Sequence, residues 1–375
     1  MKWTCSKDIV QEMLSKTQGF TERKTTLSIL GHVLLVAGEE TLKIRATDLH
    51  TSIEVHSPCL VERPGRCAIN AKGFLDVVRE LPSGDMVFET DDDGSRAHLV
   101  LENKKIILNI MDPDEFPSID LNVPSSGTHI PVEAMKHLIE KTMFSIPHTA
   151  ETDTKYSLGG ALLITRPENK GRTAVEMVTT DTRRLSLSRY VMDGKISMGE
   201  GIIVPRKGLQ EIKKLFDEKE QGAGVVITPT SLYYVSETTS ATVRLFEGTF
   251  PEYRNVVDLS TYPNTVRMNA QELLGVLRVC AVMVSDLMNC VRFSFKKDKT
   301  IVYANNPEQG EVDTVISSEL DGDEVDISFN PRYFIDCLAF IEQDALLHLR
   351  GSQGPCLVMD ADHDDCKWII MPMRY

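Results

Sequence analysis

The sequence lacks any long apolar run. Its 375 residues contain no stretch approaching the ~18–20 consecutive apolar residues that a membrane helix needs. The first segment, MKWTCSKDIVQEML, is interrupted by charges and has the pattern of an amphipathic helix rather than of a signal peptide. We therefore expect a cytoplasmic protein with no membrane partner.

Cysteine motifs are also missing. The eight cysteines are scattered, mostly inside apolar runs, and they form no CxxC pair and no metal-ligand spacing. We interpret them as buried, reduced thiols, and we expect no metal site.

Catalytic motifs are absent as well. The nine histidines form no HExxH pattern, and the chain has no GxSxG, Walker A or GxGxxG motif. Two acidic runs, residues 91–94 and 360–365, lack the ligand series of an EF-hand, so we interpret them as acidic turns. The sequence predicts a protein that is not an enzyme and has no cofactor. The enzyme alternative is a metal-dependent nuclease or DNA-modifying enzyme that uses these acidic runs.

The chain has fewer basic than acidic residues. The chain has 41 Lys and Arg against 55 Asp and Glu, a formal net charge of −14. A nucleic-acid-binding protein usually carries a basic surface, so the average charge argues against such a partner. The distribution of the cations decides the question, and it depends on how the chain is organised.

A threefold repeat organises the chain, which is too long for one hydrophobic core. One helix pattern occurs at residues 8–14, 133–139 and 272–277, and a second occurs at residues 70–79, 204–212 and 330–338. Successive copies start 125 to 139 residues apart. Such regular spacing indicates duplication of a domain.

Each copy also contains strand patterns. Runs with strand character at residues 42–46, 174–178 and 300–304 are each followed by a polar turn, at 47–50, 180–183 and 305–308. A glycine pair at 158–161 is expected in a strand with close backbone packing. Turn-forming residues mark joints at 122–127 and 258–263. We predict an α+β fold of three tandem domains, 1–125, 126–260 and 261–375, each with two helices packed on antiparallel sheets.

Cations recur at matched positions of the second helix. Lys72 with Arg79, and Lys207 with Lys214, lie seven residues apart and therefore on one helix face. Lys136 adds a cation on a first helix. If all helices face one side, these cations form a surface that holds phosphates without reading bases. The alternative is that they only keep exposed helix faces soluble.

Several motifs together resemble the bacterial sliding clamp family, the β subunit of DNA polymerase III. They are Leu27–Gly31, Ala46–Leu49, Thr180-Asp181 with Arg184-Leu185, Phe250–Arg254, Ala304–Gln309 and Met371–Arg374. The resemblance covers essentially the whole chain. It implies a head-to-tail homodimer, a ring of six domains with pseudo-sixfold symmetry that encircles duplex DNA without sequence specificity. It implies as partners duplex DNA, a second copy, the polymerase catalytic subunit, the clamp loader and other DNA-metabolism proteins that carry short peptide motifs.

The resemblance also implies three sets of site residues. A peptide cleft between the second and third domains comprises Leu158, Thr180, Thr182, Arg183, Arg184, Leu185, Pro251, Asn255, Val256, Met288, Cys356, Ile369, Ile370, Met371, Pro372, Met373 and Arg374. DNA contacts carried over by position are Lys24, Lys155, Tyr156, Arg206 and Lys207. The dimer contact joins Ile106 and Leu108 to Val282 and Met283.

The chain departs from the family pattern within this cleft. Thr182-Arg183 stands where Gly-His is usual, Asn255 where a basic residue is frequent, Met288 where an aromatic residue is found, and Tyr375 in place of a terminal Leu. Partner peptides are therefore expected to differ in detail. Residues 368–373 also have the pattern of a core strand, with alternate side chains facing the core and the cleft. A scaffold that uses only this cleft and does not bind DNA is a second alternative.

Overall fold

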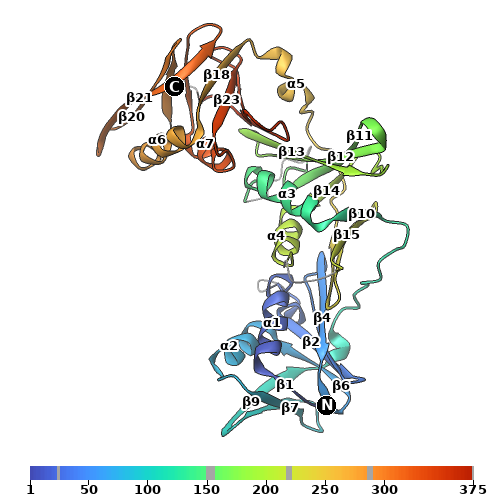
Figure 1. Ribbon diagram of the computed structural model, residues 1–375. Helices are drawn as coiled ribbons and strands as arrows, with labels where there is room; N and C mark the ends of the chain where they lie inside the picture. Colours follow the sequence, from blue (N-terminus) through green and yellow to red (C-terminus); the bar gives the residue numbers. More distant parts are fainter. Residues whose placement is uncertain (23–25, 149–156, 217–221, 285–289, 374–375) are drawn as a thin grey trace. The chain divides into compact units, whose positions relative to one another are not determined.

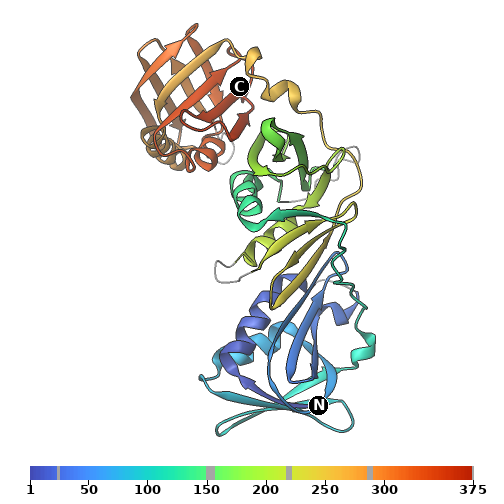
Figure 2. The same cartoon turned by 45° about the vertical axis from the view of Figure 1, so that its right-hand side comes forward.

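A computed structural model describes residues 1–22, 26–148, 157–216, 222–284 and 290–373. These residues form two compact units, which are described separately (Figures 1 and 2). The N-terminal unit contains Met1–Met135 and Lys207–Leu245, and the C-terminal unit contains Lys136–Arg206 and Phe246–Tyr375. Each unit thus includes part of the middle predicted domain, and the domain boundaries 1–125, 126–260 and 261–375 stay a prediction.

The N-terminal unit is built on a continuous antiparallel sheet. Thirteen strands of the described residues pair in the order β10-β15-β16-β17-β4-β3-β2-β6-β9-β8-β7-β1-β5. Their bounds are β1 Lys2–Ser6, β2 His32–Gly38, β3 Thr41–Thr47, β4 Thr51–Pro58, β5 Leu60–Arg63, β6 Gly65–Asn70, β7 Asp85–Thr90, β8 Arg96–Leu101, β9 Lys104–Met111, β10 Thr128–Pro131, β15 Gly224–Ile227, β16 Ser231–Val235 and β17 Thr239–Arg244.

Helices α1 (Lys7–Thr17) and α2 (Ala71–Glu80) lie side by side on one face of this sheet (Figure 1). Each buries one apolar stripe, and α2 begins where the Asn70 side chain accepts the Gly73 N–H at 2.8 Å. Residues 2–6 form β1, so the expectation of a helix from the start of the chain was wrong there. Trp3 and Cys5 are buried between more exposed neighbours, which is the period of a strand.

The C-terminal unit has a second antiparallel sheet. Twelve strands of the described residues pair in the order β14-β11-β12-β13-β25-β24-β23-β18-β21-β20-β19-β22. Their bounds are β11 Gly160–Pro167, β12 Arg172–Thr180, β13 Arg184–Asp193, β14 Ile202–Pro205, β18 Asn264–Asn269, β19 Val291–Phe295, β20 Lys299–Asn306, β21 Gly310–Asp321, β22 Val325–Phe329, β23 Asp344–Leu349, β24 Cys356–Asp360 and β25 Cys366–Ile370.

The remaining α-helices are α3 Val132–Thr142, α4 Arg206–Lys214, α5 Arg254–Val257, α6 Ala270–Met283 and α7 Pro331–Leu338. Short 3-10 helices occupy Gln18–Phe20 (η1), Ser28–Gly31 (η2), Pro113–Glu115 (η3), Met143–Ser145 (η4), Asn169–Gly171 (η5) and Leu259–Thr261 (η6). Helices α6 and α7 pack on each other against the strands of the third predicted domain (Figure 1). No helix in the described part of the chain is long and apolar enough to cross a membrane.

The predicted repeat is confirmed at the level of elements. Helices α1, α3 and α6 fall on the first repeated pattern, and α2, α4 and α7 fall on the second. Helix α4 starts two residues later than its pattern because Val204 and Pro205 end β14. The expected close packing is found at Gly160, where a Cβ would lie 2.5 Å from the Val204 carbonyl oxygen. All eight cysteines are buried and free, as predicted.

The sheet of each unit is extended in the same way. In the N-terminal unit, β17 pairs antiparallel with β4, and in the C-terminal unit β25 pairs antiparallel with β13. In both cases the last strand of one predicted domain joins the strand that follows the polar turn of the preceding domain.

Candidate partner-binding cleft and cation surface

The polar turn between β12 and β13 is fixed by its own side chains. The Thr180 hydroxyl donates to the Arg184 carbonyl at 2.7 Å and accepts the Thr182 N–H at 3.1 Å. The Asp181 carboxylate accepts the N–H groups of Arg183 and Arg184 at 3.0 and 2.9 Å. Thr182 is held at φ 72°, in the left-handed region that favours glycine. The Thr182 and Arg183 side chains are exposed at this turn and can contact a bound partner.

Arg184 is held by several partners in the C-terminal unit. Its guanidinium contacts the Asp181 carboxylate at 3.0 Å, the Asp336 carboxylate of α7 and the carbonyl of Phe144. It also lies 4.6 Å from the centroid of the Tyr333 ring, and its side chain is only 14% exposed. The guanidinium is thus bound within the protein. The sequence did not predict the roles of Asp336 and Phe144, because their proximity to Arg184 arises only in the folded chain.

An apolar floor lies behind this turn. Leu185, Val256 and Ile369, all predicted cleft residues, belong to one hydrophobic cluster. Its buried members are Leu162, Val178, Leu185, Leu187, Ile203, Tyr253, Tyr262, Leu357, Met359 and Ile369, and Phe250, Val256, Val257 and Leu346 pack against them. The cluster joins strands β11–β13 to α5, β24 and β25, so it forms the base of a candidate cleft.

Strand β25 has two faces. Ile369 belongs to the cleft cluster, whereas Trp368 and Ile370 belong to the core of the third predicted domain, as the alternating pattern predicted. Cys356, predicted as a cleft residue, has no exposed surface and pairs with Ile370 on the core side. In this structure its thiol cannot reach a ligand, because strand periodicity places it on the face opposite Ile369.

Other predicted cleft residues line two separate cavities of the C-terminal unit. Pro251 lines a cavity of about 290 Å³ beside Leu162 and Tyr253. Pro372 and Met373 line another of about 460 Å³ beside β22, where the Met373 N–H donates to the Ser328 carbonyl at 2.8 Å, and no lining residue of this cavity belongs to the apolar cluster. Met371 is 40% exposed, and its N–H donates to the Arg183 carbonyl at 2.9 Å.

Three further predicted positions differ in exposure, and two lie beyond the described structure. Leu158 is buried before β11, and Thr180 is buried in the polar turn, whereas Asn255 is exposed. Met288 and Arg374 lie outside the described residues.

Among the described residues, the cations of α2 are exposed and form no ion pair, whereas Lys207 and Lys214 of α4 are ion-paired. On α2, Lys72 and Arg79 are exposed, and Asp76 lies on the same helix face. On α4, Lys207 binds the buried Asp48 carboxylate, and Lys214 contacts Glu211 at 2.7 Å. Positive charge on α4 is therefore partly neutralised.

The pKa of Asp48 reflects this pairing. Burial alone would raise it, but the hydrogen bonds from Lys207 and from the N–H groups of Thr51 and His50 outweigh burial and lower the pKa. Asp48 is therefore a carboxylate at neutral pH, and the charge of Lys207 is shared with it.

Arg206 binds backbone carbonyl groups of the C-terminal unit. Its guanidinium donates to the carbonyl oxygens of Met143, at 3.1 Å, and Ile146. Burial lowers its pKa from the ordinary value. Lys136 is half-buried on α3, and the predicted DNA contacts Lys24, Lys155 and Tyr156 lie outside the described residues.

The predicted dimer residues lie at two open positions. Ile106 and Leu108 are half-buried on β9, which pairs with β8 along residues 104–109 but with β6 only at Ile110 and Met111. One edge of residues 104–109 is thus unpaired in the described structure. At the end of α6, Val282 is 72% exposed and Met283 is half-buried.

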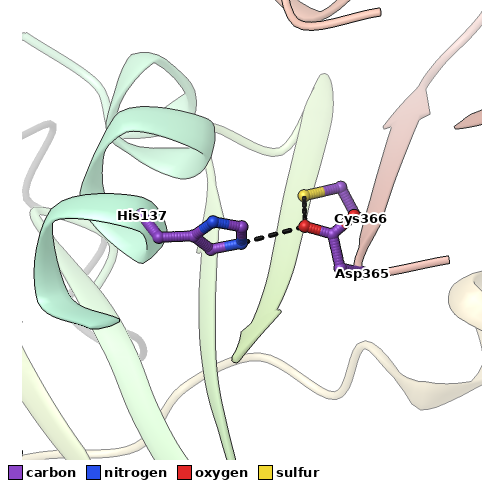
Figure 3. Close-up of side chains that lie close together, drawn as sticks. All are labelled: His137, Asp365 and Cys366. Atoms are coloured by element: carbon purple, nitrogen blue, oxygen red, sulfur yellow. Dashed lines mark hydrogen bonds and ion pairs between the residues drawn. The ribbon is translucent and has the colours of Figure 1, made fainter. Parts of the chain in front are cut away.

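A cluster of titratable side chains lies between α3 and the start of β25 (Figure 3). His137 Nε2 lies 2.9 Å from Asp365 Oδ2, the Lys141 ammonium lies 2.9 Å from the same oxygen, and Cys366 Sγ lies 3.6 Å from it. The close contact with His137 and the hydrogen bond from Lys141 hold the pKa of Asp365 well below its usual range.

His137, Asp365 and Cys366 are side chains of the types that bind metals. However, Lys141 already neutralises the carboxylate, and burial raises the pKa of the Cys366 thiol to about 12. The geometry therefore favours an ion-paired contact between α3 and β25 over a cation site. The acidic turn predicted at 360–365 thus contains one carboxylate with a specific partner.

Comparisons with known proteins agree with this architecture. Three models of the DNA polymerase III beta subunit match the chain in succession: the N-terminal domain at residues 1–120, the central domain at 129–252 and the C-terminal domain at 260–374. The beta sliding clamps of Vibrio cholerae and Escherichia coli are 28% and 27% identical to the chain, and each comparison covers all of both chains.

Solved structures give the same result. The pol III beta of Caulobacter crescentus superposes with a TM-score of 0.91 at 25% identity, over all of both chains. The DNA polymerase III subunit beta of Pseudomonas aeruginosa superposes with a TM-score of 0.87 at 26% identity, again over all of both chains. With three consecutive domain matches and relatives that align from end to end, the chain belongs to the DNA polymerase III beta subunit family, the bacterial sliding clamps.

Proposed function

We propose that this chain is a DNA sliding clamp that pairs with a second copy in a closed ring around duplex DNA. It tethers a replicative polymerase and other proteins through the cleft between β13, α5 and β25. As a processivity factor it performs no chemistry of its own. The observation that carries the proposal is that the sheets of both units are extended in the same way. The same kind of extension could join the partly unpaired strands β9 and β21 of two different copies.

The partly unpaired strands β9 and β21 of the described structure correspond, in the threefold repeat, to strands that pair with each other elsewhere in the chain. Strand β9 ends the first domain as β17 and β25 end the second and third. Strand β21 follows the polar turn of the third domain as β4 and β13 do in the first two. Over residues 310–317, β21 pairs with β20, and it pairs with β18 only over 318–321. By the rule that joins β17 to β4 and β25 to β13, β9 of one copy would pair with β21 of another.

This contact is head to tail, and such contacts either close a ring or grow a filament. Closure with two copies gives six domains. Exposed apolar side chains on both edges, Ile107 on β9 and Val315 on β21, support burial by a partner, because open strand edges otherwise promote aggregation. Val282 at the end of α6 supports the same contact.

Weak attraction to DNA suits a ring. Topological linkage holds the DNA, so strong phosphate contacts would only slow sliding. Lys72 and Arg79 are exposed and can contact DNA phosphates, whereas Lys207 is ion-paired with Asp48. This division supports sequence-independent contact with a modest salt dependence.

The cleft supports docking of short peptides. Leu185, Val256 and Ile369 form an apolar base, and Met371 offers a flexible, polarizable side chain at the edge. An extended peptide with apolar side chains would anchor there. We propose the polymerase catalytic subunit and the clamp loader as carriers of such peptides.

The test is retention on circular DNA. Protein loaded on a circular plasmid by its clamp loader should stay bound through gel filtration and should be lost after the plasmid is linearised. Retention that does not depend on plasmid topology would contradict the proposal. Light scattering should give twice the 42.0 kDa chain mass.

A pair of variants links retention to the ring. Ile106→Lys with Leu108→Lys should give a monomer that is not retained, because two charges would enter the β9 contact. Leu60→Lys changes an equally apolar but separate residue, 66% exposed on β5, and should leave both dimer and retention intact. A dimeric, retained double variant would exclude the β9 contact.

A further inference from the structure

A further cavity lies in the N-terminal unit, where β17 joins β4. It measures about 450 Å³, and its lining includes Leu49, Ser52, Ile119, Tyr233, Thr242 and Arg244. All its lining residues belong to the N-terminal unit. It is separate from the candidate peptide cleft, which the C-terminal unit forms.

The turn beside this cavity repeats the turn of the peptide cleft bond for bond. The Thr47 hydroxyl donates to the Thr51 carbonyl at 3.0 Å and accepts the Leu49 N–H at 3.0 Å. The Asp48 carboxylate accepts the N–H groups of His50 and Thr51 at 2.9 and 2.5 Å. These bonds match those of residues 180–184 in donor, acceptor and order along the chain.

The neighbouring strand is placed in the same way. The Arg244 N–H donates to the His50 carbonyl at 2.8 Å, as the Met371 N–H donates to the Arg183 carbonyl at 2.9 Å. The cavity therefore occupies the position in its unit that the peptide cleft occupies in the other. Arg244 is the counterpart of Met371.

The matched side chains have changed from apolar to polar. In the strand registers, Leu185 faces Ile369, and Ser52 faces Thr242 at the corresponding place. On the next strand Leu357 faces Ile369, and Tyr233 faces Thr242. A ligand of this cavity would thus meet hydroxyl groups and a guanidinium instead of an apolar floor.

Leu49 adds an apolar edge. It is 53% exposed and has φ 74°, a conformation that few residues other than glycine adopt. Asparagine or aspartate would be easier there, because a short polar side chain can bond locally. Strain at an exposed apolar residue is a pointer to a binding role. Ile119, half-buried in the same lining, provides a second apolar contact.

The Arg244 guanidinium in the lining indicates which kind of ligand the cavity could bind. Arg244 is exposed, and its guanidinium forms no ion pair with the residues that the structure describes. The lining also contains one exposed carboxylate, Asp120, whose Oδ1 accepts the Asn122 N–H at 3.0 Å and which keeps its charge. A free guanidinium beside hydroxyl donors suits a carboxylate, which arginine binds through two parallel hydrogen bonds.

We propose that this cavity is a second peptide-docking site, which takes a short extended peptide with an acidic side chain next to an apolar one. The acidic group binds Arg244 and the neighbouring hydroxyls, and the apolar group packs on Leu49 and Ile119. The site adds a partner to the proposed function and does not require the ring or the other cleft.

Two matched peptide libraries test this on the full chain. Both contain acetylated hexapeptides with randomised flanking positions, and the third residue is Asp in one library and Asn in the other. Selected Asp peptides should shift the methyl NMR signals of Leu49 and Ile119. Their Asn counterparts should bind at least tenfold more weakly. Libraries that leave both methyl signals unmoved, or that bind equally, would overturn the proposal.

Arginine variants complete the test. Arg244→Gln should weaken the selected peptides at least tenfold, and Arg244→Lys should recover part of the loss, because it keeps the charge without the fork geometry. Arg96→Gln changes another exposed arginine of the same unit and should not alter binding. Acetate alone should not reproduce the methyl shifts. Unchanged peptide affinity in the Arg244→Gln variant, with its melting temperature retained, would exclude the site.

Discussion

Arg184 holds the polar turn of the cleft to helix α7. Its replacement should lower the stability of the chain by a measurable amount. Arg184→Gln would leave the Asp336 carboxylate without its cation and remove the contact with the Tyr333 ring. We expect the free energy of unfolding of the chain to fall by about 1–3 kcal/mol, measured by urea denaturation.

Arg183→Gln is the matched control for this prediction. The Arg183 side chain is exposed, so its loss should change stability by no more than about 0.5 kcal/mol. Equal stability losses in the two variants would show that the contacts of Arg184 contribute nothing particular.

Asp365 makes stability depend on pH. Its pKa in the folded chain is lowered, first by His137 and then by Lys141. The stabilisation is therefore complete above the ordinary pKa of about 4 and is lost as the pH falls below it toward the folded pKa. Asp365→Asn should lower the free energy of unfolding by roughly 1–2 kcal/mol at pH 7.

The difference between the wild-type chain and Asp365→Asn should shrink as the pH is lowered from 5 to 3, and urea denaturation at each pH measures it. Asp364→Asn alters the exposed neighbouring carboxylate and should follow the wild-type curve. A constant difference at all pH values would assign the effect to packing instead of charge.

At the scale of elements, η1 and α4 meet within the N-terminal unit at a glycine whose neighbouring space is filled by a side chain of α4. A Cβ on Gly19 would overlap the Glu211 carboxylate, which is buried on α4. Gly19→Ala should therefore lower the free energy of unfolding by about 1 kcal/mol, since the end of the flexible Glu211 side chain must move from its buried position.

A double-mutant cycle separates this overlap from a general effect of alanine. When Glu211→Ala is already present, Gly19→Ala should cost much less, because the overlapping group has been removed. Unfolding of all four proteins in urea gives the coupling free energy. Additive losses would mean that the two elements do not constrain each other at this position.

Elements with a strong period were predictable from the sequence, and contacts between elements were not. The apolar stripe that contains Phe74, Leu75 and Val78 identified α2, because helix periodicity is local. By contrast, Cys356 was assigned to the cleft by position, whereas the register opposite Ile370 places it in the core. The join of β25 to β13 arises from pairing over long sequence distances, for which the local pattern carries no signal.

The candidate site shows the same division. Leu185 and Ile369 were predicted and lie together, because the family resemblance carries information about tertiary contacts. The lysines of α4 were predicted as free phosphate contacts from their spacing. The sequence pattern could not reveal that Asp48, 159 residues away, would neutralise Lys207.

At the scale of the whole molecule, a net charge of −14 must be reconciled with a proposed DNA partner. A ring that encloses DNA needs attraction only on its inner surface, and elsewhere acidic residues limit nonspecific binding. The exposed pair Lys72 and Arg79 provides the clearest test of this distribution. Lys207 is less suitable, because Lys207→Glu would place a carboxylate against Asp48 and disturb the fold.

Lys72→Glu with Arg79→Glu should leave the dimer intact while reducing retention on circular DNA and the slope of retention against the logarithm of salt concentration, since fewer counterions are released. Gel filtration over a salt series measures both. Lys297→Glu with Lys299→Glu reverses two exposed lysines on a strand turn and changes the net charge equally. If that control lost retention as steeply, overall charge would govern binding. A loss confined to the α2 variant would mean that local phosphate contacts govern it.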